Sequence, residues 1–170
     1  SDLHVSGLFV WTGFDYLGEP TPYWWPSRSS FFGIVDLAGF PKDIYYMYKS
    51  EWTNEPVLHI FPHWNWKEGE PVDIWAYYNN ADEVELYLNG KSLGVRQKTD
   101  STYHVSWRVP FTPGTLKAVS RLGGKEVLVK EIHTAGEPAR LVLTPDRSVI
   151  QADGSDLSFV TIDVCDIDGN

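Results

Sequence analysis

The sequence is short of positive charge and almost free of cysteine. Its 170 residues include 14 Lys and Arg against 23 Asp and Glu, so the formal net charge is −9 at pH 7. A nucleic-acid-binding protein normally shows a basic surface, and a negative field repels phosphate, so the composition argues against that class. A single cysteine, Cys165, excludes an internal disulfide, and no Cys/His cluster indicates a metal site. We interpret Cys165 as a small core residue.

Long hydrophobic runs are missing as well. No apolar stretch approaches the roughly 18 residues of a membrane span. No basic segment followed by an apolar one predicts a signal peptide. The chain opens Ser1-Asp2-Leu3-His4, without Met and within a polar stretch, which we interpret as the start of a piece cut from a longer protein.

Aromatic residues, by contrast, are abundant. They make up 15% of the chain, with eight Trp, nine Tyr and eight Phe, in a total hydrophobic content of 42%. Most such rings fill cores and interfaces, but they also stack on the C–H faces of sugars. The stretch FVWTGFDYLGEPTPYWW at positions 9–25 concentrates them in what reads as a loop. The composition therefore raises the expectation of a carbohydrate-related protein.

Residues 1–53 read as an incomplete unit. The apolar run at 8–11 is compatible with a short buried strand, and a long loop rich in Gly and Pro follows. Pro41 is expected to open a helix that has Asp43 in its first turn. Residues at helical spacing are expected to pack inward, namely Ile44, Met47, Tyr48 and Trp52. One strand and one helix cannot enclose a core, so this segment predicts the last βα unit of something larger.

Residues 54–135 read as an all-β domain. Apolar and polar residues alternate over 72–78, 84–88, 103–109 and 116–121, and a further run follows Gly123-Gly124. Asn89-Gly90 is the strongest short hairpin signal in the chain. Strands at this spacing predict a β-sandwich. We interpret Asp82, Glu83 and Glu85 as a solvated sheet edge.

Residues 136–170 predict two more strands, in ARLVLTPD and LSFVTIDVCDIDGN. Two or three strands are too few for a sandwich, so this segment is expected to be the start of a further domain. Asp166, Asp168, Gly169 and Asn170 faintly resemble a calcium loop, but the distal Glu is missing and a β-turn is the favoured interpretation.

Residues 7–52 resemble the end of the catalytic barrel of glycoside hydrolase family 2 β-galactosidases. The resemblance rests on a Trp at the end of the eighth barrel strand, on an Asp-Tyr-Leu-Gly-Glu-Pro loop, and on a Ser-x-x-Gly-x-x-Asp-x-x-Gly-x-x-Lys-Asp run. Here that run consists of Ser30, Gly33, Asp36, Gly39, Lys42 and Asp43. The stretch HWNWKEGEPVDIWAYYNNADEVELYLNGKSLG resembles the sandwich that follows the barrel in many bacterial members.

The resemblance implies a mainly β fold. An immunoglobulin-like β-sandwich at 54–135 would be preceded by the last βα unit of a (β/α)8 barrel at 1–53. The start of a second immunoglobulin-like domain would follow at 136–170.

The resemblance also implies a retaining hydrolase of terminal β-galactosides that needs no cofactor and no metal. In the family both catalytic groups are glutamates on loops after the fourth and seventh barrel strands, so both would lie upstream of this chain. We therefore expect no catalytic residue here, and no activity without the missing N-terminal part of the same enzyme. The expected partner is a β-linked sugar or oligosaccharide. Relatives that degrade polysaccharides suggest a periplasmic or extracellular location.

The predicted substrate-binding residues are Trp11, Asp15, Tyr16 and Trp24. The indole of Trp11 would form the floor of a sugar subsite, or else pack at the barrel top. Asp15 and Glu19 have the spacing of an acid–base pair. We favour loop support for them, with Asp15 accepting backbone amides and Glu19 pairing with an arginine such as Arg28. Tyr16 bonds either substrate or a neighbour. Trp24, like Trp25, either lines an outer cleft or packs the loop on the barrel or on the next domain.

An alternative from another class is a non-catalytic role for the sandwich. It would be a carbohydrate-binding module if aromatic rings formed an exposed row, and a spacer otherwise. Trp75 is the main candidate for such a ring, because it falls on the strand face opposite Val72, Ile74 and Ala76.

Overall fold

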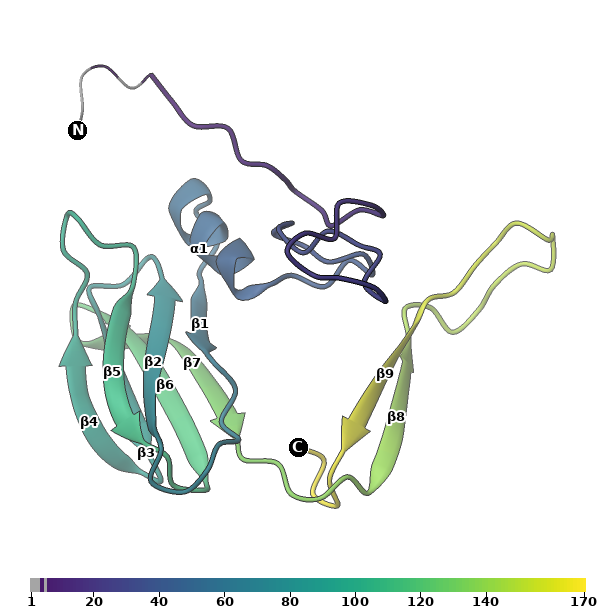
Figure 1. The fold of residues 1–170 in the computed structure, drawn as a ribbon. Coiled ribbons are helices and arrows are strands. Elements are labelled where there is room, and N and C mark those ends of the chain that lie inside the picture. The colour runs from purple at the N-terminus through teal and green to yellow at the C-terminus, as the bar shows by residue number, and fades with distance from the viewer. Residues whose placement is uncertain (1–3, 5) are drawn as a thin grey trace.

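The computed structural model of the chain describes residues 4 and 6–170 and shows mainly antiparallel β-structure (Figure 1). Residues 1–3 and 5, the beginning of the predicted barrel segment, lie outside the described residues. A single helix, α1 (Asp43–Trp52), precedes nine strands within the described part of the chain. The strands are β1 (Leu58–Phe61), β2 (Pro71–Tyr78), β3 (Glu83–Leu88), β4 (Lys91–Arg96), β5 (Val105–Pro110), β6 (Thr115–Leu122), β7 (Lys125–His133), β8 (Arg140–Pro145) and β9 (Val160–Cys165).

Strands β1 to β7 form two sheets that face one another across one core. One sheet has the order β1-β2-β5 and the other the order β4-β3-β6-β7, and all neighbours are antiparallel. Alternation along each strand directs the apolar side chains inward, as in β5, where Val105, Trp107 and Val109 are buried and the residues between them are exposed. Trp64, Ile74 and Leu86 are completely buried between the sheets. Burial of each such side chain stabilises the fold by about 1.5–3 kcal/mol.

The hairpin predicted at Asn89-Gly90 joins β3 to β4. Both turn residues have positive φ, 51° at Asn89 and 80° at Gly90. A two-residue turn with these angles matches the twist of the flanking strands, which explains why this dipeptide is found there. The interpretation of Asp82, Glu83 and Glu85 as a sheet edge is wrong, because β3 lies between β4 and β6. Strand β4, which follows the turn, was not predicted, because its residues KSLGVR show too little alternation.

The direction of the chain after β7 is fixed by hydrogen bonds to the loop between β1 and β2. The side-chain amide of Asn65 donates to the carbonyl of Ala135 at 2.8 Å and accepts the Ala135 N–H at 3.1 Å. The Thr134 hydroxyl donates to the carbonyl of Trp64 at 2.9 Å. The last residues of the sandwich are thus tied to the loop that carries its most buried tryptophan.

Strands β8 and β9 pair with each other and with no third strand in the described residues. Their register places Leu141 opposite Val164 and Leu143 opposite Ile162, all of them more than half exposed. Cys165 is half-buried at the end of β9 and outside the core, contrary to its interpretation as a core residue. The reason is that a two-stranded ribbon has no second layer to bury it.

The expected barrel strand at 8–11 is not formed. Leu8 is 90% exposed and Phe9 fully exposed, and residues 6–10 have no regular structure. A barrel strand takes its hydrogen bonds from neighbouring strands, and none is present beside these residues in the described structure. The helix begins at Asp43, with Lys42 as N-cap, whereas Pro41 pairs with Val35.

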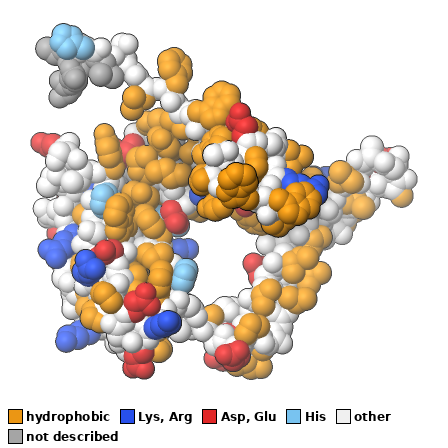
Figure 2. Space-filling view, in the orientation of Figure 1, with side chains coloured by type: hydrophobic (Ala, Val, Ile, Leu, Met, Phe, Trp, Pro, Cys, Tyr) orange, Lys and Arg blue, Asp and Glu red, His pale blue; other side chains and the backbone are white. Residues whose placement is uncertain are grey.

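The expected inward packing of the helix is likewise incomplete. Ile44 and Trp52 are exposed, and Met47 and Tyr48 are half-buried. Hydrophobic side chains gather on the surface over the N-terminal loop and the β8–β9 hairpin (Figure 2).

Candidate functional site

The loop at 12–42 is held together by the residues of the family motif. Ser30 is buried, its hydroxyl accepts the Tyr16 N–H at 3.0 Å, and its own N–H donates to the Tyr16 carbonyl at 2.8 Å. The Gly33 N–H donates to Asp15 Oδ1 at 2.7 Å. A Cβ at position 33 would lie 2.2 Å from the Asp15 nitrogen, so only glycine allows this approach.

Asp15 is the central anchor of this loop. Its second carboxylate oxygen accepts from Lys42 Nζ at 2.7 Å, and the same ammonium donates to the carbonyl of Phe31 at 2.7 Å. The hydrogen bond from Lys42 lowers the pKa of Asp15, with help from the Gly33 amide. Only 9% of the Asp15 side chain is exposed. This geometry matches the interpretation of Asp15 as loop support, with Lys42 as the partner that the sequence did not reveal.

The last acidic residues of the motif close a turn and join the helix to the sandwich. Asp36 Oδ1 accepts the backbone N–H groups of Ala38 and Phe40 at 2.9 and 2.8 Å. Asp43 lies 2.7 Å from Nε2 of His59 on β1, and the Tyr46 ring stacks on the same imidazole at 3.8 Å. Burial lowers the pKa of His59 in spite of Asp43. The motif residues thus have structural partners at every step from the loop to the sandwich.

Trp11 and Tyr16 are brought into contact on the exposed side of the loop. Trp11 Nε1 donates to the Tyr16 hydroxyl at 3.3 Å, and the two rings meet edge to face at 6.4 Å. The Tyr16 hydroxyl donates in turn to the carboxylate of Glu19, which raises the pKa of Tyr16. Trp11 is 74% exposed, and the peptide bond that follows it is cis. The indole is therefore held by its edge while most of its surface remains accessible.

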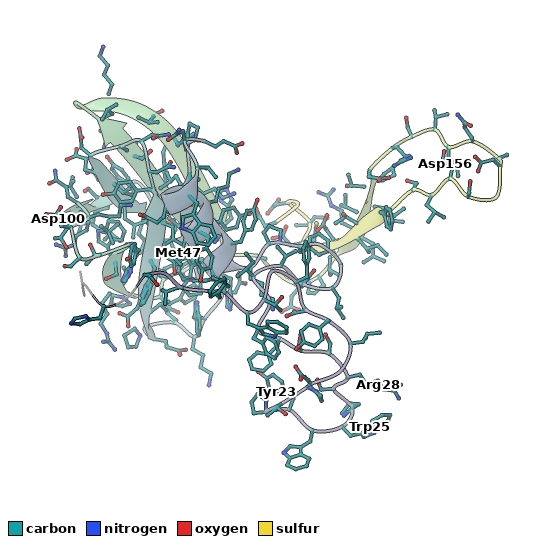
Figure 3. All side chains as sticks on the ribbon, turned by 90° about the horizontal axis from the view of Figure 1, so that it is seen from above. Tyr23, Trp25, Arg28, Met47, Asp100 and Asp156 are labelled. Carbon is teal, nitrogen blue, oxygen red and sulfur yellow. The ribbon has the colours of Figure 1, made fainter. Side chains whose placement is uncertain are left out.

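The expected pairing of Glu19 with Arg28 is not formed. Arg28 lies over the ring of Trp25, with its guanidinium carbon 4.4 Å from the ring centroid (Figure 3). The physical reason is local: Tyr16 is three residues from Glu19 and already supplies a hydrogen bond, whereas Arg28 has an aromatic face beside it.

The second aromatic group of the loop is its outer tip, which carries Tyr23 and Trp25 together with Arg28 (Figure 3). Trp24 is 88% exposed and Trp25 75% exposed within the described residues, where Arg28 packs on the ring of Trp25. A hollow of about 360 Å³ lies nearby, lined by Asp15, Tyr23, Ser27, Ser29, Ser30, Phe31, Asp36, Leu37 and Ala38. Asp15 is the predicted site residue that lines it, whereas Trp11, Tyr16 and Trp24 lie outside this hollow. Tyr23 and Phe31, in edge-to-face contact at 5.0 Å, were not singled out from the sequence.

The tryptophans of the sandwich do not form an exposed row. Trp64 is fully buried and donates to the Thr112 carbonyl at 3.1 Å. Trp75 lies on the outward face as predicted but is half-buried, because its ring stacks on His104 at 4.0 Å. The planar sugar platform expected of a binding module is therefore absent at Trp75.

The described residues contain neither a group of metal ligands nor a helix that could span a membrane. Among residues 4 and 6–170, no three His, Cys, Asp or Glu side chains are grouped so as to hold a metal ion. In the same part of the chain no helix has the length and apolar character to cross a membrane. The Asp166 carboxylate accepts the N–H groups of Gly136, Asp168 and Asn170, which confirms the turn interpretation of residues 166–170.

The relatives of this chain are carbohydrate enzymes. It is 64% identical over 166 residues, 98% of its length, to a protein from Bacteroides ovatus named β-galactosidase BoGH2A, of which it covers 20%. It is 39% identical over 173 aligned residues to a putative β-glucuronidase from Formosa agariphila, covering 97% of this chain and 16% of that protein. The family model described as domain of unknown function DUF4982 matches residues 69–128.

Solved structures agree with these relatives. A β-glycosidase from Bacteroides vulgatus matches 92% of the chain with a TM-score of 0.84 at 36% identity, and the chain covers 20% of it. A glycosyl hydrolase family 2 member from Bacteroides cellulosilyticus matches 94% of the chain with a TM-score of 0.84 at 33% identity, and the chain covers 25% of it. The fold is thus that of a β-rich segment of a glycoside hydrolase. The chain belongs to glycoside hydrolase family 2, and it spans about a fifth of the length of the curated relatives it matches.

Proposed function

We propose that the protein containing this chain hydrolyses terminal β-galactosides, and that this chain supplies one wall of its sugar pocket. The observation that carries the proposal is the 64% identity to a protein named as a β-galactosidase. Identity at this level extends over nearly the whole chain, so it includes the loop that holds Trp11 and Tyr16.

The proposed chemistry is that of a retaining glycosidase. One carboxylic acid protonates the leaving oxygen and a carboxylate roughly 5–5.5 Å away attacks the anomeric carbon. Both groups are expected upstream of this chain, so Asp15 and Glu19 are not the catalytic pair. Their engagement with Lys42 and Tyr16 supports this assignment.

Within the pocket we assign Trp11 to stacking on the sugar. Its indole is accessible, and the hydrogen bond to Tyr16 limits its rotation, so little ordering is needed on binding. Tyr16 positions Trp11, and Asp15 positions the loop beneath both. Trp24 is assigned to the outer part of the cleft, where its exposed ring would contact the leaving group.

We further infer the domain organisation. The strand orders β1-β2-β5 and β4-β3-β6-β7 support an immunoglobulin-like sandwich within 54–135. The exposed apolar residues of 8–14 and of β8–β9 support the proposals that 1–53 completes a (β/α)8 barrel and that 136–170 begins a second immunoglobulin-like domain. A periplasmic or extracellular location stays a prediction.

The test compares the whole protein with this chain on chromogenic β-galactoside and β-glucuronide substrates. The whole protein is expected to cleave the galactoside with the higher kcat/KM and to release product with retained anomeric configuration. The chain alone is expected to give no turnover above background. Preference for the glucuronide would overturn the substrate assignment, and turnover by the chain alone would overturn the placement of the catalytic groups.

A further inference from the structure

The outer face of the four-stranded sheet carries a hollow that the proposed function does not use. Helix α1 packs on the other sheet, where Asp43 meets His59 on β1, so the outer face of β4-β3-β6-β7 is on the opposite side of the sandwich. The hollow has a volume of about 460 Å³. Pockets of roughly 300–1,000 Å³ are the usual size for small-molecule ligands.

The floor of the hollow is apolar. Val119 on β6 lies between the inward-facing residues Ala118 and Ser120, and its side chain therefore points outward, yet it is only 2% exposed. Longer side chains around it account for this burial. Tyr87 on β3 pairs with Lys117 beside it, and Glu85 is the cross-strand partner of Val119 itself. Val119 packs beneath the longer side chains, and the partly exposed ring of Tyr87 provides the apolar surface at the bottom of a polar rim.

One side of the rim is fixed in advance by hydrogen bonds. Arg121 donates to Glu85 Oε2 at 2.8 Å and to the Tyr87 hydroxyl at 3.1 Å. Ser92 on β4 donates to the other oxygen of Glu85 at 2.6 Å. The hydrogen bonds from Ser92 and Tyr87 lower the pKa of Glu85, which keeps its carboxylate ionised at neutral pH. Groups already ordered in this way lose little freedom when a ligand arrives.

The other side of the rim offers donors and acceptors in balance. Lys117 and Arg121 on β6 are the cross-strand partners of Glu131 and Glu126 on β7, and all four residues line the hollow. The Lys117–Glu131 pair is separated by 3.6 Å and both side chains are more than 40% exposed, so water or a ligand hydroxyl exchanges with it at little cost. A rim with two cationic and two anionic side chains favours neither an anionic nor a cationic ligand. A hydroxyl group, which donates and accepts, suits such a rim.

We propose that this hollow is a binding site for a neutral sugar, one or two residues long. The apolar C–H face of the sugar would lie on the ring of Tyr87, and its hydroxyls would bond Lys117 and the rim carboxylates. The site differs from the Trp75 position considered from the sequence, because it lies on the other sheet. It does not depend on the proposed hydrolase activity, which uses a different part of the chain.

The experiment titrates the 170-residue chain with a β-linked galactobiose and follows backbone amides by NMR. Amides of β3 and β6 around Tyr87 and Val119 are expected to shift on addition of sugar. Tyr87→Ala and Lys117→Ala should each weaken binding, by about tenfold for loss of the ring. Trp75→Ala is the matched control, since it removes an outward aromatic ring from the opposite sheet, and it should leave the affinity unchanged.

The other outcomes overturn the proposal. Absence of shifts at roughly 10 mM sugar, the limit of weak but specific binding, would exclude the site. Shifts that survive both Tyr87→Ala and Lys117→Ala would place binding elsewhere. Tighter binding of galacturonic acid than of galactobiose would contradict the neutral ligand class. If the spectrum of Tyr87→Ala shows loss of fold, Lys117→Ala decides alone, because its side chain is 44% exposed.

Discussion

The sandwich and the β8–β9 hairpin contain similar alternating strands but bury them very differently. Ile74 and Leu86 of the sandwich are 0% exposed, whereas Leu143 and Ile162 of the hairpin are 59% and 61% exposed. The alternation is as clear in β9, where Val160, Ile162 and Val164 alternate with Thr161 and Asp163, as in the strands of the sandwich. Alternation therefore predicts which face of a strand is apolar, but burial requires a second layer, and among the residues that the structure describes only the sandwich has one.

The loop at 12–42 differs from both the sandwich and the hairpin, because polar contacts give it a defined structure. Its apolar residues Phe14 and Trp24 are exposed, yet Asp15, Ser30 and Lys42 hold its backbone through hydrogen bonds. A segment can thus keep a defined shape without a core of its own when buried polar groups satisfy its backbone.

The largest expected effect is on the free energy of unfolding, and it compares one isoleucine of the sandwich with one of the hairpin. Ile74→Ala in the sandwich should lower the free energy of unfolding by about 2–5 kcal/mol, because it leaves a cavity in a closed core. Ile162→Ala in the hairpin should change it by less than about 0.5 kcal/mol, since that side chain is mostly exposed. Urea unfolding followed by circular dichroism measures both values. Equal losses would show that the hairpin is as well packed as the sandwich.

A second prediction concerns the polar anchor of the loop. Lys42→Met leaves the Asp15 carboxylate and the Phe31 carbonyl without their shared donor, and this should destabilise the loop by about 1–3 kcal/mol. Faster cleavage within 12–42 by a protease, compared with the original chain, is the measurement. The matched control is Lys49→Met, which breaks the exposed Lys49–Glu55 pair at 2.7 Å and should change cleavage little. Similar cleavage rates for the two variants would show that Lys42 does not anchor the loop.

A third prediction asks whether the exposed rings of the loop bind substrate. In the whole protein, Trp11→Ala should lower kcat/KM by about tenfold or more, because a stacking surface of about 1.4 kcal/mol is lost. Trp52→Ala serves as control, since Trp52 is 69% exposed on the helix and has no assigned role in the pocket. A change below about threefold for Trp11→Ala would favour a packing role for this ring.

The smallest expected effect is a loss of stability in acid at the junction before the β8–β9 hairpin, where Asp166 accepts the Gly136 N–H. The pKa of Asp166 is lowered to about 2, chiefly by the N–H groups of Gly136 and Asn170. Because its unfolded pKa is about 3.9, the carboxylate contributes stability that is complete above about pH 5 and is lost as the pH falls toward 2.

Hydrogen exchange of the Gly136 amide measures this junction. The protection factor of this amide, which is its intrinsic exchange rate divided by its observed rate at the same pH, should fall in acid, and Asp166→Asn should remove most of that pH dependence. Asp163→Asn, an exposed change on β9, is the matched control. A pH dependence that persists in Asp166→Asn would assign the effect to other groups.

The sequence allowed much of the sandwich to be predicted and less of its surroundings. Alternation located β2, β3, β5 and β6 to within about two residues, since strand period and burial coincide there. It missed β1, whose four residues LHIF are too short to show a period and whose His59 faces the helix. It placed a strand at 8–11 that requires partners outside the described residues.

The candidate site was predicted in outline only. Loop support for Asp15 was favoured because the family's catalytic glutamates lie elsewhere, but Lys42, 27 positions away, could not be named as its partner. Glu19 was paired with the wrong residue because charge favours Arg28, whereas the nearer Tyr16 hydroxyl satisfies the carboxylate. Whether Trp11, Asp15, Tyr16 and Trp24 contact substrate stays a prediction.

The fixed direction of the chain after β7 has a consequence for how such a sandwich can be joined to other domains. Asn65 and Thr134 fasten the final residues of the sandwich to its own first loop, so the direction in which the chain leaves is set inside the domain. A gene rearrangement that joins a different domain after Ala135 would inherit that direction without altering a single core contact. The sandwich is therefore suited to act as an interchangeable connector in the evolution of multidomain enzymes.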